Sequence, residues 1–246
     1  MSPQLIMNPL GFPILSTVTF LPLLGVAVIL LLKKEEPIKV TALIATLINF
    51  IFSLVLFFNF DPKTPLFQFG ERIGWIPAYN INYVLGVDGI TVMLVALTAL
   101  ISPLCVLCSW RAIEKRVKEF MICLLLMETA MIGVFCALDF ILFYLFWEAM
   151  LIPMYLLIAV WGGPQKDYAS LKFFIYTLFG SVFLLVAIIA LYLTNGTFGI
   201  MEAMFKKYPF NFQIWIFLAF TIAFAIKVPM FPFHTWLPAA HTEAPT

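Results

Sequence analysis

Charged residues are scarce in this sequence of 246 residues, where Asp, Glu, Lys and Arg together make up 11%. Hydrophobic residues make up 63%, and the mean hydropathy is +1.06. Because soluble domains carry about 25% charged residues, this composition excludes that class and indicates a polytopic membrane protein. No cluster of basic residues resembles a nucleic-acid footprint, so we expect no nucleic-acid partner.

Cysteine and histidine are also rare, with four and two residues. All four cysteines lie within apolar runs. Cys105 and Cys108 form a CxxC pair, but no second pair and no βαβ pattern accompanies it. We therefore expect the cysteines to be small buried hydrophobic residues rather than a redox or metal site. The sequence shows no GxGxxG or P-loop motif and no cysteine set for an iron–sulfur cluster, so we expect no cofactor in this chain.

Seven apolar runs of about 20 residues are each long enough to span a membrane. They predict an all-α polytopic protein with about seven transmembrane helices. The links are short except at 59–88, where partly alternating residues predict a small hairpin or an extended cap. The join at 137–139 is so tight that the fourth and fifth helices should be antiparallel neighbours. The runs lie at 12–32, 40–58, 89–110, 120–138, 140–161, 171–193 and 212–233.

Lysine and arginine are distributed unevenly between the two sets of links, which predicts that the N-terminus lies outside. The N-terminal residues lack the positive region of a cleaved signal, so we expect the first run to be retained. In this orientation the segment from 234 onward lies at the inner face. The four cations on the outer side are Lys63, Arg72, Lys206 and Lys207, and the nine on the inner side are Lys33, Lys34, Lys39, Arg111, Lys115, Arg116, Lys118, Lys166 and Lys172.

The fifth run carries a carboxyl group near its middle, at Glu148. An ionised side chain at that depth costs roughly 2.5–3.5 kcal/mol on insertion scales. Pro153 cannot donate a hydrogen bond to the carbonyl of Ala149, so the helix should be loosened beside the acid. A helix that only anchors a protein needs neither feature, so we interpret Glu148 as the centre of a charge or proton pathway. The aromatic residues before it, including Trp147, are interpreted as packing.

The seventh run repeats this design with a cation, because Lys227 is followed by Pro229 and Pro232. These prolines should free the carbonyls of Ala225 and Val228 from the helix ladder. Broken helices at membrane depth mark the pathway in transporters. If Lys227 lies close to Glu148, the two groups titrate as a pair and form a switch. The alternative is a buried structural ion pair.

Glu128 lies near the middle of the fourth run, and we expect it at a depth similar to that of Glu148. It either takes part in the pathway or forms a hydrogen bond to a neighbouring helix. His234 and His241 are seven residues apart, but Pro238 should interrupt the helix face that they would share. Two isolated imidazoles make a poor metal site, so we predict a proton relay between the pathway and the inner surface.

Three stretches of the chain resemble the antiporter-like membrane subunits of respiratory NADH:quinone oxidoreductase, complex I. They are VLGVDGITVML at 84–94, LLLMETAMIGVFCALDFILFYLFWEAMLIPMYLLIAVWGG at 124–163, and FAIKVPMFPFHTWLPAAHTEAPT at 224–246. The LGVDGI and LMETAMIGVF segments are most similar to the branch called chain M, or subunit 4 in mitochondria. The sequence departs from the family at Ala239, where an acid usually precedes the alanine of an LPDAH-like motif.

The resemblance implies that Glu148 and Lys227 form the central protonatable pair of a half-channel. It also implies that Glu128, His234 and His241 belong to the pathway or its lining. The family is about twice as long and is built from inverted repeats, so this chain corresponds to the first half. A second half then comes from another chain, or the sequence is a fragment. We expect 1–110 to form an N-terminal three-helix segment with an outer loop at 59–88, and 111–246 to form the first half-channel repeat, which stops after the seventh helix.

The function implied by the resemblance is proton translocation in the respiratory chain, coupled to electron transport from NADH to quinone. The expected partners are other complex I membrane-arm subunits, the lipid bilayer and protons. NAD, FMN, iron–sulfur clusters and quinone would belong to partner subunits. The expected location is a bacterial plasma membrane or, if organellar, the mitochondrial inner membrane. Alternatives are a multisubunit cation/proton antiporter, the membrane subunit of a proton-pumping hydrogenase, and a scaffold that only anchors other subunits.

Overall fold

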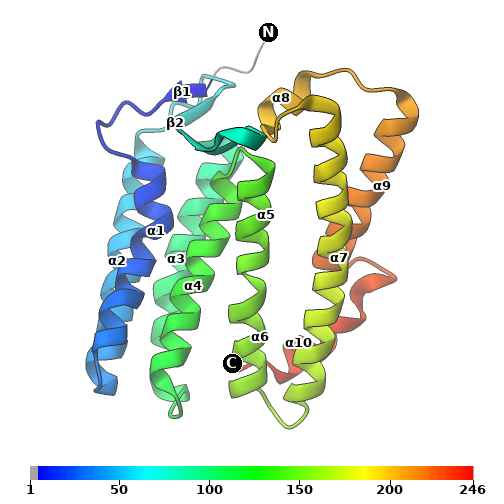
Figure 1. The fold of residues 1–246 in the computed structure, drawn as a ribbon. Coiled ribbons are helices and arrows are strands. Elements are labelled where there is room, and N and C mark those ends of the chain that lie inside the picture. The colour runs from blue at the N-terminus through cyan, green and yellow to red at the C-terminus, as the bar shows by residue number, and fades with distance from the viewer. Residues whose placement is uncertain (1–4, 246) are drawn as a thin grey trace.

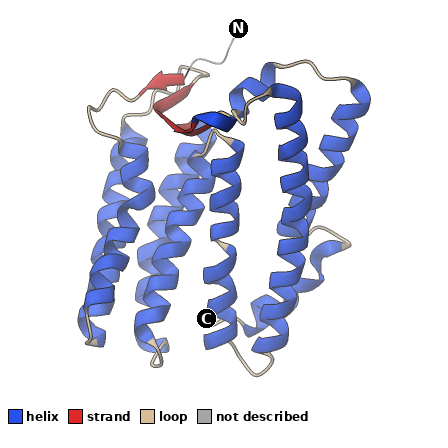
Figure 2. Ribbon diagram, viewed as in Figure 1, coloured by secondary structure: helices blue, strands red, loops and turns tan. Residues whose placement is uncertain are grey.

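The computed structural model describes residues 5–245 and shows a helical bundle with a small sheet at one end (Figures 1 and 2). The two short helices α8 (Ile200–Phe205) and α10 (Trp236–Glu243) lie at opposite ends of the bundle (Figure 1). The long helices are α1 (Ile14–Leu31), α2 (Glu35–Phe58), α3 (Gly89–Ala112), α4 (Val117–Cys136), α5 (Phe140–Ala149), α6 (Leu151–Trp161), α7 (Lys166–Asn195) and α9 (Phe210–Lys227).

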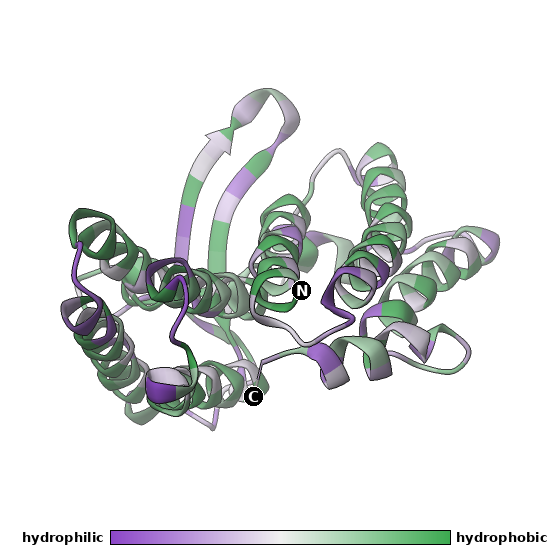
Figure 3. Ribbon diagram, turned by 90° about the horizontal axis from the view of Figure 1, so that it is seen from below, coloured by the Kyte–Doolittle hydropathy of each residue, from purple (hydrophilic) through white to green (hydrophobic). Residues whose placement is uncertain are grey.

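Within residues 5–245, seven candidate membrane spans confirm the predicted number, with α5 and α6 together forming the fifth. Each span is apolar on most of its circumference, because one side packs in the bundle and the other faces outward. Viewed along the bundle, most of the ribbon of each helix has the colour of hydrophobic residues, and hydrophilic residues gather at the ends and connections (Figure 3). This distribution fits a multi-pass membrane protein.

The predicted hairpin in the 59–88 link is present, formed by β2 (Phe67–Ile76) and β3 (Ile81–Val87). A third strand, β1 (Leu5–Met7), pairs in parallel with β2 and was not predicted. The hairpin is attached to α1 through the carboxylate of Glu71, which accepts hydrogen bonds from the backbone N–H groups of Leu15 at 2.8 Å and Ser16 at 3.1 Å. A carboxylate satisfies the free N–H groups at a helix N-terminus and complements its dipole.

The turn between α4 and α5 is held from both sides by backbone hydrogen bonds. Leu138 donates to the carbonyl of Val84 in β3 at 2.9 Å, and Phe140 donates to the carbonyl of Phe198 at 2.9 Å. Ile200 donates in turn to the carbonyl of Leu138 at 3.0 Å. The two helices are packed neighbours, as the tight join predicted. The start of α5 is therefore fixed between the hairpin and the segment that precedes α8.

The end of the bundle opposite the sheet carries the α1–α2, α3–α4 and α6–α7 connections (Figure 1). There the Lys118 ammonium donates to the carbonyls of Leu30 at 2.7 Å and Leu32 at 2.9 Å, near the end of α1. Lys39 donates in the same way to the carbonyl of Trp110, at 2.7 Å, near the end of α3. Cations at these positions complement the negative ends of the helix dipoles. Which side of a membrane this end faces remains a prediction.

The expected burial of the cysteines is confirmed for two residues and wrong for two. Cys123 and Cys136 are buried within α4, whereas Cys105 and Cys108 are exposed. Cys105 and Cys108 lie three residues apart on the outward side of α3. In a run that is apolar all round, the sequence does not show which side of the helix faces outward.

Candidate functional site

The membrane span that carries Glu148 is interrupted beside this residue, as predicted. α5 ends at Ala149, Met150 lies outside regular helix, and α6 begins at Leu151. Pro153 falls in the first turn of α6. The N–H groups of a first turn have no acceptor within their own helix, so the missing N–H of Pro153 costs α6 no hydrogen bond. Glu148 is partly exposed, but its Oε1 atom is buried without a hydrogen-bond partner. This oxygen is available to a proton or to a donor from another residue.

Lys227 is the last residue of α9, so the helix ends six residues before the predicted end of the seventh span at 233. The carbonyl of Ala225 is not free, contrary to the prediction. Pro229 has no N–H to donate to this carbonyl, and the N–H of Met230 donates to it instead, at 2.8 Å. The indole N–H of Trp236 donates to the carbonyl of Ile226, also at 2.8 Å. The segment after Lys227 therefore folds back onto the end of α9.

The Lys227 ammonium lies over the ring of Trp147, 4.9 Å from the ring centroid. Trp147 directly precedes Glu148 in the chain, so the ammonium lies beside the residue next to this acid. Within the described residues, however, the only ion pair closer than 4.0 Å joins Arg116 and Glu119, at 3.4 Å. The structure thus brings the two predicted residues near each other without a direct ion pair. Trp147 was interpreted from the sequence as packing, and its contact with a cation was missed.

Glu128 is buried, with 1% of its surface exposed, and it faces α2. Its Oε1 atom accepts a hydrogen bond from the side-chain amide of Asn49 at 2.8 Å. Glu128 Oε2 and Asn49 Oδ1 are both buried without partners. A cavity of about 260 Å³ between α2, α3 and α4 lies beside this pair, and its lining includes Thr46, Thr98 and Ser102. Glu128 therefore has the predicted hydrogen bond to another helix and also an oxygen that remains available.

The two acids lie at matching positions on their helices. Glu128 is eight residues before the end of α4, and Glu148 is eight residues after the start of α5. At 1.5 Å per residue, both lie about 12 Å from the turn that joins these helices. Glu128 nevertheless bonds to Asn49 of α2, and no hydrogen bond joins the two acids among the contacts of residues 5–245.

The two histidines lie on different elements. His234 is in the 3₁₀ turn Phe233–Thr235, with its Nδ1 atom buried and unpartnered, while His241 is exposed on α10. Pro238 does not interrupt α10, contrary to the prediction, because it falls in the first turn of that helix. In the part of the chain that the structure describes, no three His, Cys, Asp or Glu side chains gather as a metal site.

Asp139 connects the start of α5 to the hairpin. Its Oδ1 atom accepts hydrogen bonds from the N–H groups of Ile141 at 2.9 Å and Leu142 at 3.3 Å, which caps the helix. Its Oδ2 atom accepts from the N–H of Asn82 at 3.2 Å. Burial raises the pKa of Asp139, while these hydrogen bonds oppose the shift. The bond between Asp139 and the hairpin was not predicted from the sequence.

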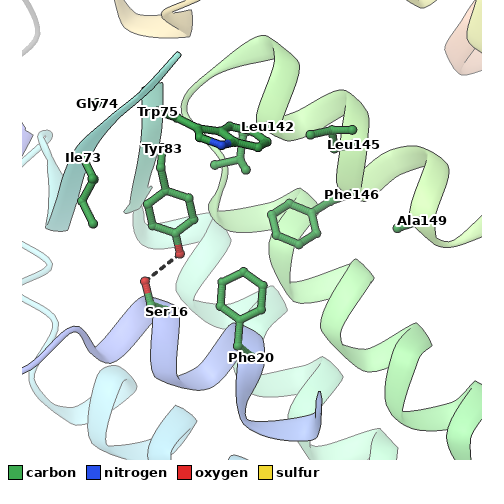
Figure 4. A pocket seen from close by; sticks show the side chains of 10 residues that line it. All are labelled: Ser16, Phe20, Ile73, Gly74, Trp75, Tyr83, Leu142, Leu145, Phe146 and Ala149. Carbon is green, nitrogen blue, oxygen red and sulfur yellow. Dashed lines mark hydrogen bonds between the residues drawn. The ribbon is translucent and has the colours of Figure 1, made fainter. Parts of the chain in front are cut away.

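A pocket of about 600 Å³ lies between the hairpin, α1 and α5 (Figure 4). The Ser16 and Tyr83 hydroxyl groups meet at its wall, 2.6 Å apart, and burial raises the pKa of Tyr83 to about 12. The lining carries no charged side chain, so this pocket lies outside the candidate pathway. The lining residues are Ser16, Phe20, Ile73, Gly74, Trp75, Tyr83, Leu142, Leu145, Phe146 and Ala149.

Two family models match adjoining parts of the chain. Residues 17–134 match a model described as NADH-ubiquinone oxidoreductase chain 4, amino terminus, and residues 137–246 match one described as NADH:quinone oxidoreductase/Mrp antiporter, TM. The chain is 45% identical to NADH-quinone oxidoreductase subunit M of Rhodobacter capsulatus, with 95% of this chain and 49% of the relative covered. It is 43% identical to NADH-ubiquinone oxidoreductase chain 4 of Arabidopsis thaliana, with 94% and 48% covered.

The fold matches a chain of respiratory complex I from Thermus thermophilus with a TM-score of 0.83 and 30% identity. This match covers 94% of the present chain and 47% of the Thermus chain. The chain thus spans about half the length of the relatives that it matches.

Proposed function

We propose that this chain, which belongs to the family of antiporter-like membrane subunits of NADH:quinone oxidoreductase, carries a proton-translocating half-channel of that complex. One observation carries this proposal. A carboxyl group and an ammonium group lie beside two separate helix interruptions, at Met150 and after Lys227, and the ammonium contacts Trp147, the residue directly before the carboxyl group, without a direct ion pair. Interrupted helices at membrane depth are tolerated where protein or a pathway covers the backbone.

The separation of the two charges allows a switch. In the separated state seen here, Glu148 Oε1 has no hydrogen-bond partner and can receive a proton. At an effective dielectric constant of 20, a direct ion pair at about 4 Å is worth about 4 kcal/mol and the same charges at about 8 Å about 2 kcal/mol, so closure gains about 2 kcal/mol. Because 1.36 kcal/mol corresponds to one pKa unit, closure and opening change the proton affinity of Glu148 by roughly thirtyfold. A cycle of closing and opening therefore releases a proton and takes one up.

Glu128 and the two histidines complete the proposed pathway. Glu128 lies at the depth of Glu148, and its Oε2 atom remains available. His234 lies in the turn that follows Lys227, and His241 is exposed at the end of the bundle opposite the sheet, where it can exchange protons with solvent. We assign them the roles of a second proton site and an inner-face relay.

The chain in this proposal acts with other subunits. NAD, FMN, iron–sulfur clusters and quinone are held by partner subunits, and redox energy reaches this chain as an electrostatic or conformational change in its neighbours. The host membrane is a bacterial plasma membrane or the mitochondrial inner membrane, with the N-terminus outside. Residues 111–246 supply the half-channel, and residues 1–110 form the N-terminal segment, whose Asn49 contacts Glu128.

The test is the number of protons moved per NADH oxidised, measured in sealed vesicles that contain the assembled complex. Glu148→Gln and Lys227→Met should each lower this ratio while the complex still assembles and oxidises NADH. Glu202→Gln is the matched control, because Glu202 lies on α8 outside the membrane spans. A normal ratio in Glu148→Gln would contradict the proposal and would support a role as a scaffold.

A second candidate is a subunit of a multisubunit cation/proton antiporter. It is favoured by the description of the model that matches 137–246, which includes Mrp antiporters. Sodium-dependent proton movement in vesicles without NADH would support this candidate. Proton movement that requires NADH and is independent of sodium supports the complex I subunit.

A further inference from the structure

The ammonium group of Lys227 contacts an aromatic ring and makes no direct ion pair with a carboxylate among the described residues. Its Nζ atom lies 4.9 Å from the centroid of the Trp147 ring, within the range of a cation–π interaction. Among the aromatic rings of residues 5–245, one other has a cation placed in this way, Tyr168 beneath Lys172 at 5.5 Å. Tyr168 is exposed, whereas 9% of Trp147 is exposed. Of the two contacts, the one at Trp147 is therefore the less weakened by water.

The Trp147 ring is held from three helices. Its indole N–H donates to the hydroxyl of Ser181 on α7 at 3.3 Å. Phe224 on α9, about one turn before Lys227, contacts it with ring centroids 5.7 Å apart, and Phe143 on α5 contacts it at 5.6 Å. A ring fixed in this way presents a constant face to the end of α9.

Trp147 and Glu148 are consecutive residues, so their side chains leave α5 in directions about 100° apart. The lysine side chain is flexible and ends in a compact charge. Because the ring and the carboxylate belong to adjacent residues, rotation of the Lys227 side chain changes the distance of the ammonium from both groups. The two positions hold the same charge at different distances from Glu148.

We propose that Trp147 is a positioning residue that holds the Lys227 ammonium away from Glu148 in the open state of the switch. This inference rests on the proposed function, because it concerns the same pair of charges. If the ring loses its attraction for the ammonium, Lys227 moves to Glu148 and the ion pair stays closed. Proton movement then falls, while electron transfer in the partner subunits continues.

The experiment replaces Trp147 with tryptophans that carry one, two or three fluorine atoms, introduced at this codon alone, in the assembled complex. Fluorine withdraws electron density from the ring face with little change in volume, and the indole N–H to Ser181 remains. The number of protons moved per NADH should fall stepwise with each fluorine. Loss of the cation–π interaction should shift the balance between the two lysine positions by about tenfold.

Trp236 supplies the matched control. It is buried to a similar degree, with 6% exposed, and its indole N–H also has a partner, the carbonyl of Ile226. The same fluorinated tryptophans at Trp236 should leave the proton ratio unchanged. A conservative series gives an independent check, since Trp147→Phe should keep part of the proton ratio and Trp147→Leu should lose most of it.

Two results would overturn the inference while the proposed function stands. One is an unchanged proton ratio through the fluorinated series at Trp147, when Glu148→Gln still lowers it. The other is an equal effect of fluorination at Trp147 and Trp236, which would indicate packing. A normal ratio in Glu148→Gln overturns both the inference and the proposed function.

Discussion

The buried cap at Asp139 allows a prediction that can be worked out bond by bond. Asp139→Ala removes the acceptor for two N–H groups of α5, which costs about 1 kcal/mol for a helix cap. It also leaves the N–H of Asn82 without its partner, at a cost of about 1–3 kcal/mol for a partly buried donor. The free energy of unfolding should therefore fall by about 2–4 kcal/mol, the sum of these costs.

Asp88 offers a matched control for this variant. It caps α3 through the N–H groups of Ile90 and Thr91 but has no hydrogen bond to the hairpin among the described contacts. Asp88→Ala should cost about 1 kcal/mol, the cap alone. The measurement is denaturant unfolding of the purified protein in mild detergent, followed by circular dichroism. Equal losses in the two variants would refute the role given to the hairpin bond.

The pH dependence of Asp139 has a definite sign. Its pKa is raised by burial, so the folded protein binds this proton more tightly than the unfolded chain does. The stability that it contributes is fully present below the ordinary aspartate pKa of about 3.9 and is lost as the pH rises through the raised value. Asp139→Asn lacks this titration, so the wild type should lose stability relative to that variant as the pH rises across this window. The opposite slope would contradict the argument.

Two further pairs of variants test the packing around the two acids. A Cβ at Gly133 would overlap the Phe146 ring, so Gly133→Ala should lower the free energy of unfolding by about 1–3 kcal/mol, and Phe146→Leu should restore part of it. Asn49→Ala leaves Glu128 Oε1 without its donor and should cost about 1–3 kcal/mol, whereas Glu128→Gln keeps an acceptor oxygen and should cost less. Thermal unfolding in detergent measures both pairs, and an equal cost for Asn49→Ala and Glu128→Gln would contradict the second.

Hydropathy predicted the seven spans because a helix that faces lipid is apolar over a length that the bilayer sets. It failed at the end of the seventh span, where the apolar letters continue to Phe233 although the helix stops at Lys227. Hydropathy does not show which backbone groups form hydrogen bonds, so it does not show where within an apolar run the helix ends. The prolines at 229 and 232 were the local signal for this end, and they were interpreted only as loosening the helix.

Glu148, Lys227 and Glu128 were found because a charge inside an apolar run is expensive and therefore conspicuous. Asn49 was missed, although a single amide inside the second run is a weaker signal of the same kind. Trp147 could not be recognised, because an aromatic residue in a membrane span is ordinary and its role depends on Lys227, 80 positions away. Contacts of this kind arise from helix packing, which the local pattern does not encode.

An infrared difference spectrum of the assembled complex, between the resting state and turnover with NADH, tests whether Glu148 changes its protonation. We expect a band from a protonated carboxyl group that changes during turnover and is absent in Glu148→Gln. The same band should persist in Glu202→Gln, the control outside the membrane spans. If Glu148→Gln shows the same carboxyl bands as the wild type, Glu148 does not change its protonation during turnover, and the proposed switch is contradicted.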